Sequence, residues 1–123
     1  MQDRIADYDL SFLKNHEVSS ISFTLTDFAL HSNGPPDRTT HTKPDSASIE
    51  IACGFELNGE KVERGALLAL LGQTFGDCWI DTDFDLHLRF TSGDELVAIR
   101  DETGFECYLI QWSLDPNKYV AII

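Results

Sequence analysis

The sequence has few cysteines and no long apolar run, and each shortage excludes a class of protein. Its three cysteines form no C-x-x-C pair, so neither a disulfide framework nor a zinc knuckle is indicated. We expect the cysteines to be small apolar side chains of the core. No stretch approaches the roughly 20 apolar residues of a membrane span. The acidic beginning lacks the basic-then-apolar order of a signal peptide. These features predict a cytoplasmic protein.

Basic side chains are also scarce, which limits the partners that the protein can bind. Nine lysines and arginines stand against 21 aspartates and glutamates, so the formal net charge is −12. A protein that grips nucleic acid needs cationic side chains to replace the counterions of the phosphates, and an anionic membrane surface repels an acidic chain. We therefore expect neither partner. The charge permits a strongly basic protein partner, or it serves only to keep a small protein in solution.

Motifs of catalysis and metal binding are missing from the chain. It has no G-x-S-x-G nucleophile elbow, no phosphate-binding glycine loop and no H-x-x-x-H pair. Asp81, Asp83 and Asp85 begin an EF-hand pattern, but Leu86 and Ser92 replace its glycine and its bidentate glutamate. We predict no enzyme activity, no metal and no cofactor. We expect all four histidines on the surface, namely His16, His31, His41 and His87.

The sequence does contain enough apolar residues for a core, spaced mainly as in β-strands. Hydrophobic residues make up 42% of the chain, which suits a single domain over residues 1–123. Apolar and polar residues alternate over several short segments, as in half-buried strands. The predicted strands cover residues 21–30 with a bend near Asp27, 48–57, 74–80, 84–90, 95–99 and 105–112, with a last strand after a turn at 115–117.

This pattern predicts a mainly β fold of the α+β type, built from antiparallel meander sheets. One short helix is expected near residues 64–71, where leucines cover one broad face and Gly72 suits the position after a helix. Residues 32–46 hold three prolines and many small polar side chains, so we expect a flexible loop there.

The two halves of the chain resemble each other faintly. Leu13, Ile21 and residues 28–30 align with Leu71, Trp79 and residues 86–88 at an offset of 58, and Ile49 and Phe55 align with Ile99 and Phe105 at an offset of 50. The repeat predicts two similar halves packed as a sandwich or a barrel. The alternative is a chance likeness between two amphipathic meanders.

Negative charge is concentrated in one stretch of the sequence. Between Asp77 and Glu106 only Arg89 and Arg100 oppose nine acidic residues. We predict that these residues form an exposed negative face or rim that binds a basic partner, and that Trp79, Phe84 or Trp112 supplies an apolar anchor if exposed. The nine are Asp77, Asp81, Asp83, Asp85, Asp94, Glu95, Asp101, Glu102 and Glu106.

Several motifs carry a family resemblance over nearly the whole chain. The runs LLGQT, LHLRFTSGDEL and FECYLI resemble the pattern LLGKTV, L.L.F.DG..L and YESY.I of a family of small, uncharacterised bacterial proteins. DLSFL, ISF, SIEI and FEL are similar to the first half of that family. The motifs describe strands, turns and a helix cap and imply no catalytic residue. The chain departs from the pattern at Cys107, where a serine is common, and in its long loop.

Small acidic proteins of this kind resemble immunity proteins encoded beside bacterial toxins, including contact-dependent inhibition systems. The resemblance implies a protein that neutralises a basic toxin. We expect this toxin to be a nuclease, because a toxin that binds nucleic acid has a cationic site that an acidic surface can cover, and we expect the chain to be a monomer or weak dimer. A small ligand-binding β domain, an enzyme of unknown substrate and an assembly subunit with an exposed sheet edge are the alternatives. A ligand-binding domain would need a concave pocket with converging polar groups.

Overall fold

The computed structural model describes residues 9–35, 45–100, 107–113 and 115–122, the last of these as backbone only. In this part of the chain, nine strands form two antiparallel sheets. The five-stranded sheet has the order β1 (Glu17–Phe23), β2 (Phe28–Asn33), β3 (Ser46–Ile51), β8 (Tyr108–Trp112), β9 (Asp115–Ile122). The four-stranded sheet has the order β4 (Gly54–Leu57), β7 (Glu95–Ile99), β6 (Leu86–Phe90), β5 (Phe75–Ile80).

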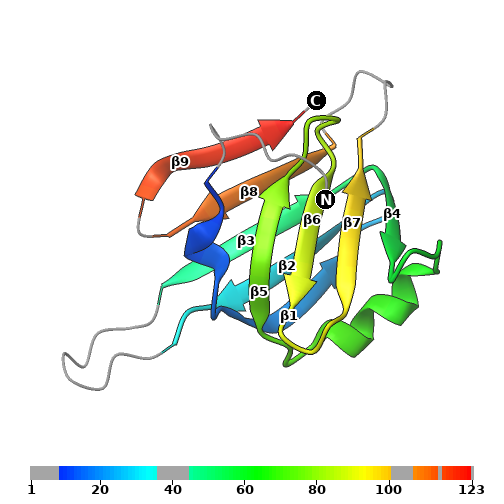
Figure 1. Cartoon of the computed structure of the whole chain (residues 1–123), viewed down its shortest axis with the longest axis horizontal. Helices are drawn as coiled ribbons and strands as arrows, with labels where there is room; N and C mark the ends of the chain where they lie inside the picture. Colours follow the sequence, from blue (N-terminus) through cyan, green and yellow to red (C-terminus); the bar gives the residue numbers. More distant parts are fainter. Residues whose placement is uncertain (1–8, 36–44, 101–106, 114, 123) are drawn as a thin grey trace.

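The two sheets lie face to face, and the strands of one cross those of the other (Figure 1). This arrangement confirms the predicted mainly β fold and its sandwich form; the described strands do not close into one barrel. The core lies between the sheets because alternate side chains of each strand point inward. Leu30, Ile49 and Ile110 from one sheet and Leu86 and Leu88 from the other are at most 1% exposed, so side chains fill the interior.

Two short 3₁₀-helices lead into the two meanders. η2 (Arg64–Leu70) confirms the helix predicted near residues 64–71. Its Leu67 and Leu70 are buried, because residues three apart share one face of a 3₁₀-helix. η1 (Ser11–Leu13) precedes β1 in the same way. Within the described residues, neither helix has the length and hydropathy needed to cross a membrane.

Some predicted strand boundaries are wrong. Residues 21–30 form a hairpin, because the backbone N–H of Thr24 donates to the carbonyl of Asp27 at 2.9 Å and closes a turn between β1 and β2. Residues 48–57 divide between the sheets as β3 and β4. Residues 115–117 belong to β9 rather than to a turn, since β9 continues the hydrogen bonding of β8.

The boundaries of the predicted loop at 32–46 are also wrong at both ends. β2 continues to Asn33, β3 begins at Ser46, and Ser32 is 2% exposed. Pairing between β2 and β3 runs as far as Asn33 and Ser46, because backbone hydrogen bonding does not require apolar side chains. Residues 36–44, the middle of the predicted flexible loop, lie outside the described residues.

The two halves of the chain have the same order of elements, as the faint repeat predicted. Each half has a 3₁₀-helix, three strands that form a meander in one sheet, and a fourth strand that joins the other sheet. Thus β4 pairs with β7 and β8 pairs with β3, while β9 is an addition at the end.

The predicted alignment between the halves is shifted in places. Ile21 pairs with Leu30, and Cys78 pairs with Leu88, so Cys78 rather than Trp79 corresponds to Ile21. The partner of Leu88 in β7 is Leu96, so Leu96 rather than Ile99 corresponds to Ile49. The shift arises because the connections between paired strands differ in length between the two halves. Phe105 lies outside the described residues.

A symmetric seam joins the halves where the helices end. The two turns have nearly the same dihedral angles, with φ −58° and ψ 133° at Lys14 and φ −59° and ψ 131° at Leu71. The next residues, Asn15 and Gly72, have positive φ of 71° and 79°. Glu17 and Thr74 form a β-bridge. Four hydrogen bonds surround it in equivalent pairs: Asn15 N to Phe75 O, Gly72 N to Val18 O, Phe75 N to His16 O, and Val18 N to Gln73 O, at 2.8–3.0 Å.

Candidate functional site: an acidic turn built on a buried histidine

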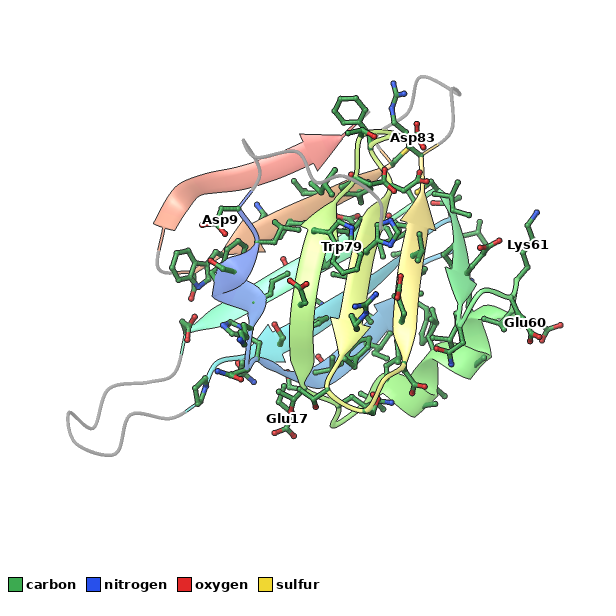
Figure 2. The ribbon with its side chains drawn as sticks, viewed as in Figure 1. Asp9, Glu17, Glu60, Lys61, Trp79 and Asp83 are labelled. Carbon is green, nitrogen blue, oxygen red and sulfur yellow. The ribbon has the colours of Figure 1, made fainter. Side chains whose placement is uncertain are left out.

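The structure separates the predicted acidic residues into two groups at opposite ends of β6. Asp81, Asp83 and Asp85 lie in the turn between β5 and β6, which we call the acidic turn, whereas Asp94 and Glu95 lie at the β6–β7 hairpin. Asp77 is exposed on β5. Figure 2 shows Asp83 at the end of the β5–β6 hairpin. The remaining predicted residues, Asp101, Glu102 and Glu106, lie outside the described residues.

Asp81 is not the exposed carboxylate that the sequence predicted. It is 1% exposed, because its side chain organises the turn from inside. One carboxylate oxygen accepts the backbone N–H groups of Asp83 and Asp85 at 2.9 and 3.1 Å. The other oxygen contacts Nε2 of His87 at 2.7 Å. Asp81 therefore shapes the acidic turn but presents no surface to a partner.

His87 corrects the prediction that the histidines are exposed, since it is 7% exposed. Its Nε2 faces Asp81, and its Nδ1 faces the Glu95 carboxylate at 3.0 Å. Glu95 also accepts from the Arg89 guanidinium at 3.2 Å. Both ring nitrogens therefore contact carboxylate oxygens, and the imidazole links Asp81 to Glu95. Both carboxylates are thus engaged within the protein.

Trp79 packs against the same network on the outer side of the four-stranded sheet. Its ring stacks on that of His87 at 4.7 Å between centroids and 3° between planes, and the Arg89 guanidinium lies 4.9 Å from its ring. Trp79 is 8% exposed, so it is not an exposed anchor. Phe84 and Trp112 are half-buried, packed respectively under the Arg100 guanidinium and against Phe12.

The backbone of the acidic turn is fixed from the core. Phe84 adopts a positive φ of 66°, which a bulky side chain rarely does. Its carbonyl accepts a hydrogen bond of 2.7 Å from the hydroxyl of Tyr108, a residue only 1% exposed. Burial raises the pKa of that hydroxyl, so Tyr108 stays neutral and donates.

The charge on Asp85 is unfavourable in the folded protein. Burial raises the pKa of this half-buried carboxyl, the negative charge of Asp81 adds to the effect, and a 2.8 Å hydrogen bond from the backbone N–H of Arg100 offsets it in part. The acidic turn therefore holds a carboxylate whose ionisation is disfavoured, beside the exposed Asp83.

Replacing Asp85 with asparagine is expected to stabilise the protein at pH 7, because the amide keeps the acceptor for Arg100 and removes the disfavoured charge. The gain should shrink as the pH falls through the raised pKa of Asp85 towards its ordinary value of 3.8, where the wild-type carboxyl also becomes neutral. Urea unfolding of both proteins between pH 7 and pH 3 measures it. A gain that is the same at every pH would contradict this explanation.

The carboxylates at the other end of β6 are held by hydrogen bonds. Gln73 and Asn58 donate to Asp94 at 2.8 and 3.1 Å and lower its pKa. For Glu95, burial raises the pKa, but the bonds from His87 and Arg89 outweigh burial and the pKa is lowered. These two residues are engaged within the fold, so the acidic turn is the better candidate for a partner contact.

A second buried histidine joins η1 to the end of β2. His16, 1% exposed, contacts the Ser32 hydroxyl through Nδ1 at 3.0 Å and the Asp45 carboxylate through Nε2 at 2.8 Å. Trp112 donates to the same carboxylate oxygen at 2.7 Å. Burial raises the pKa of Asp45, but the bonds from Trp112 and His16 outweigh it, so the pKa is lowered. Ser32 is 2% exposed, so the hydrogen bonds among this serine, histidine and aspartate lie largely inside the protein.

Sequence reasoning missed both buried histidines because their partners come from other elements, which only folding brings together. His87 follows the polar alternation of its strand, and nothing local shows that Asp81 and Glu95 approach it. A surface depression of about 380 Å³ over β1, β2, β3 and β8 was missed for the same reason; it is lined mainly by polar side chains, including Ser19, His31, Ser48 and Gln111.

Comparison of the chain with models of protein families, with curated proteins and with solved structures found no match. The resemblance to small bacterial proteins therefore stays a prediction, and the functional argument rests on the geometry of the chain itself.

Proposed function

We propose that this protein binds a basic protein partner through the acidic turn and acts as an immunity protein that neutralises a bacterial toxin with a cationic site, such as a nuclease. One observation carries the proposal. The turn gathers three carboxylates within five residues, and of these only Asp81 contacts His87 directly. Asp83 is exposed, and Asp85 is held at a raised pKa. A cationic partner would relieve this repulsion on binding.

The charge of the described surface supports a protein partner over the alternatives. Side chains are described for 14 acidic residues and five basic ones, so negative potential extends beyond the turn and would steer a basic partner toward it. A ligand-binding β domain with its site between the sheets would need room there, and here core side chains fill that space. We place the protein in the cytoplasm, where thiols such as Cys53, Cys78 and Cys107 stay reduced.

The product of the gene adjacent to this one is the partner to test, as a purified protein. We expect it to cleave nucleic acid and to be inhibited by this chain at equal molar amounts. Calorimetric titration should show an affinity that falls steeply as salt rises, because exposed charges are screened. The Asp83→Lys variant should bind about tenfold or more weakly, the loss of roughly 1.4 kcal/mol. Glu56→Lys on β4 makes the same charge change elsewhere and should bind nearly as the wild type does.

Two outcomes would overturn the proposal. One is an affinity that does not change with salt and survives Asp83→Lys. The other is a neighbouring gene product that this chain neither binds nor inhibits.

A further inference from the structure

Four large apolar side chains are exposed on the described surface, and they come from two adjoining elements. Phe23 and Leu25 lie at the end of β1 and in the turn that follows, with 41% and 95% exposure. Leu68 and Leu71 lie in η2 and just after it, with 52% and 45% exposure. Single exposed apolar residues are ordinary on protein surfaces, whereas a group of them marks an interaction site.

Hydrogen bonds hold η2 alongside β1 and so bring these residues to one side of the molecule. At one end, the backbone N–H of Gly72 donates to Val18 at 2.9 Å. At the other, Arg64 donates to the backbone carbonyls of Thr24 and Asp27 at 2.6 and 2.8 Å. The Arg64 guanidinium also lies 5.6 Å from the centre of the Phe23 ring. Phe23 and Leu25 thus lie at one end of β1, and Leu68 and Leu71 belong to the segment held along its outer edge; we call these four side chains the apolar strip.

The core does not need the outward leucines of η2. Leu67 and Leu70 are fully buried beneath the helix, and they attach it to the sandwich. Leu68 and Leu71 point away from that face and remain accessible. Polar residues could therefore have occupied the positions of Leu68 and Leu71 without loss of core packing.

Acidic side chains surround the apolar strip. Glu17 lies beside Val18, Asp27 lies in the β1–β2 turn, and Glu60 and Glu63 precede η2. Figure 2 shows η2 in the space between Glu17 on one side and Glu60 with Lys61 on the other. The nearby cations are Arg64, which is turned onto backbone carbonyls, and the exposed Lys61. Four carboxylates thus stand against two cations, and the rim is negative in balance.

We propose that the apolar strip is a docking surface for a cationic amphipathic helix of a protein partner, with apolar side chains over the leucines and lysines or arginines over the rim. This surface lies at the start of β5, whereas the acidic turn lies at its end, so the two contacts are separate. An apolar centre inside a rim of one charge is the anatomy of a protein interface. A second copy of this chain is a poorer occupant, because each copy carries a net charge of −12 and the two rims would repel each other.

The probe is a fluorescent peptide of about 18 residues made of leucine and lysine, with leucines at i, i+3, i+4 and i+7 along one helix face. A shuffled peptide of the same composition is its control. Anisotropy titration of the full chain should show binding of the amphipathic peptide at least about tenfold tighter than binding of the shuffled one. The double variant Leu25→Ser, Leu68→Ser should remove about tenfold or more of that affinity, since each leucine contributes burial. Both residues are exposed, so the variant is expected to fold.

Two further variants separate this surface from the acidic turn. Glu63→Lys should weaken peptide binding, whereas Asp83→Lys and the apolar control Leu109→Ser, on the outer face of β8, should leave it nearly unchanged. Equal affinity for the two peptides, or full affinity of the leucine variant, would overturn the proposal. Analytical ultracentrifugation is the second measurement: a wild-type dimer that the leucine variant abolishes would assign the strip to self-association instead. Loss of this proposal leaves the toxin test of the acidic turn intact, because that test uses a different surface and a different partner.

Discussion

Replacing His87 with leucine is expected to lower the free energy of unfolding by about 3–5 kcal/mol. The substitution removes the imidazole that contacts Asp81 at 2.7 Å and leaves a carboxylate that is 1% exposed without this partner. It also removes the ring on which Trp79 stacks. Urea unfolding followed by tryptophan fluorescence measures the change, and the near-ultraviolet circular dichroism of the folded state reports the altered surroundings of Trp79.

Arg89→Gln is the matched control for the loss of a charge in the same network. The Arg89 side chain is 50% exposed where it pairs with Glu95, so its removal should cost no more than about 1 kcal/mol. The double variant Asp81→Asn, His87→Leu should recover much of the lost stability. An asparagine keeps the oxygen that accepts from Asp83 and Asp85 and no longer buries a charge.

These variants distinguish two causes of lost stability: the loss of a partner for the buried Asp81 carboxylate, and the loss of side-chain packing. If His87→Leu costs no more than Arg89→Gln, the pair does not stabilise the acidic turn. If the double variant is less stable than His87→Leu alone, the unpaired charge is not the cause of the loss.

Replacing Gly34 with alanine is expected to lower the free energy of unfolding by about 2–4 kcal/mol. The added methyl group would crowd its neighbours and disturb hydrogen bonds to a charged group. A Cβ at this position would overlap with Oδ1 of Asp45 and lie 3.2 Å from Nε2 of His16. The carboxylate cannot move aside without losing the bonds from His16 and Trp112. Thermal unfolding monitored by tryptophan fluorescence is the measurement.

Gly54→Ala is the matched control, because nothing lies within 4 Å of the added Cβ in the edge strand β4. It should leave stability unchanged or raise it by about 0.5 kcal/mol. The cost of Gly34→Ala should also diminish in acid. The pKa of Asp45 is lowered in the folded protein, so its contribution is complete above its ordinary pKa of 3.8 and is lost as the pH falls through the lowered value. Equal costs for the two alanines would show that Asp45 has room to move.

Much of the fold could be predicted from the alternation of apolar and polar residues. β6 and β7 lie where Leu86, Leu88 and Leu96 alternate with polar side chains, and the helix near 64–71 follows from its leucines. The bend predicted near Asp27 is in fact a full turn between β1 and β2. The sequence could not distinguish the two, because the alternation of apolar residues changes parity in the same way whether a strand bulges or reverses.

The exchange of the fourth strand between the halves could not be predicted, since it depends on pairing between distant residues. β4 follows β3 after two residues, yet it pairs with β7 in the other sheet. The corner at Ala52, whose N–H donates to Cys107 at 2.8 Å, redirects the chain. No local pattern distinguishes such a corner from an uninterrupted strand.

The sequence by itself determined that the chain is mainly β and acidic, because composition and alternation are local properties. It only suggested two similar halves, which the order of the elements then showed. Only the tertiary structure decided which carboxylates remain on the surface. Folding brings His87 onto Asp81 and Glu95 and withdraws both from the predicted acidic face, while Asp83 stays exposed. A net charge counts ionised groups wherever they lie, whereas a partner meets only those that burial and internal pairing leave accessible.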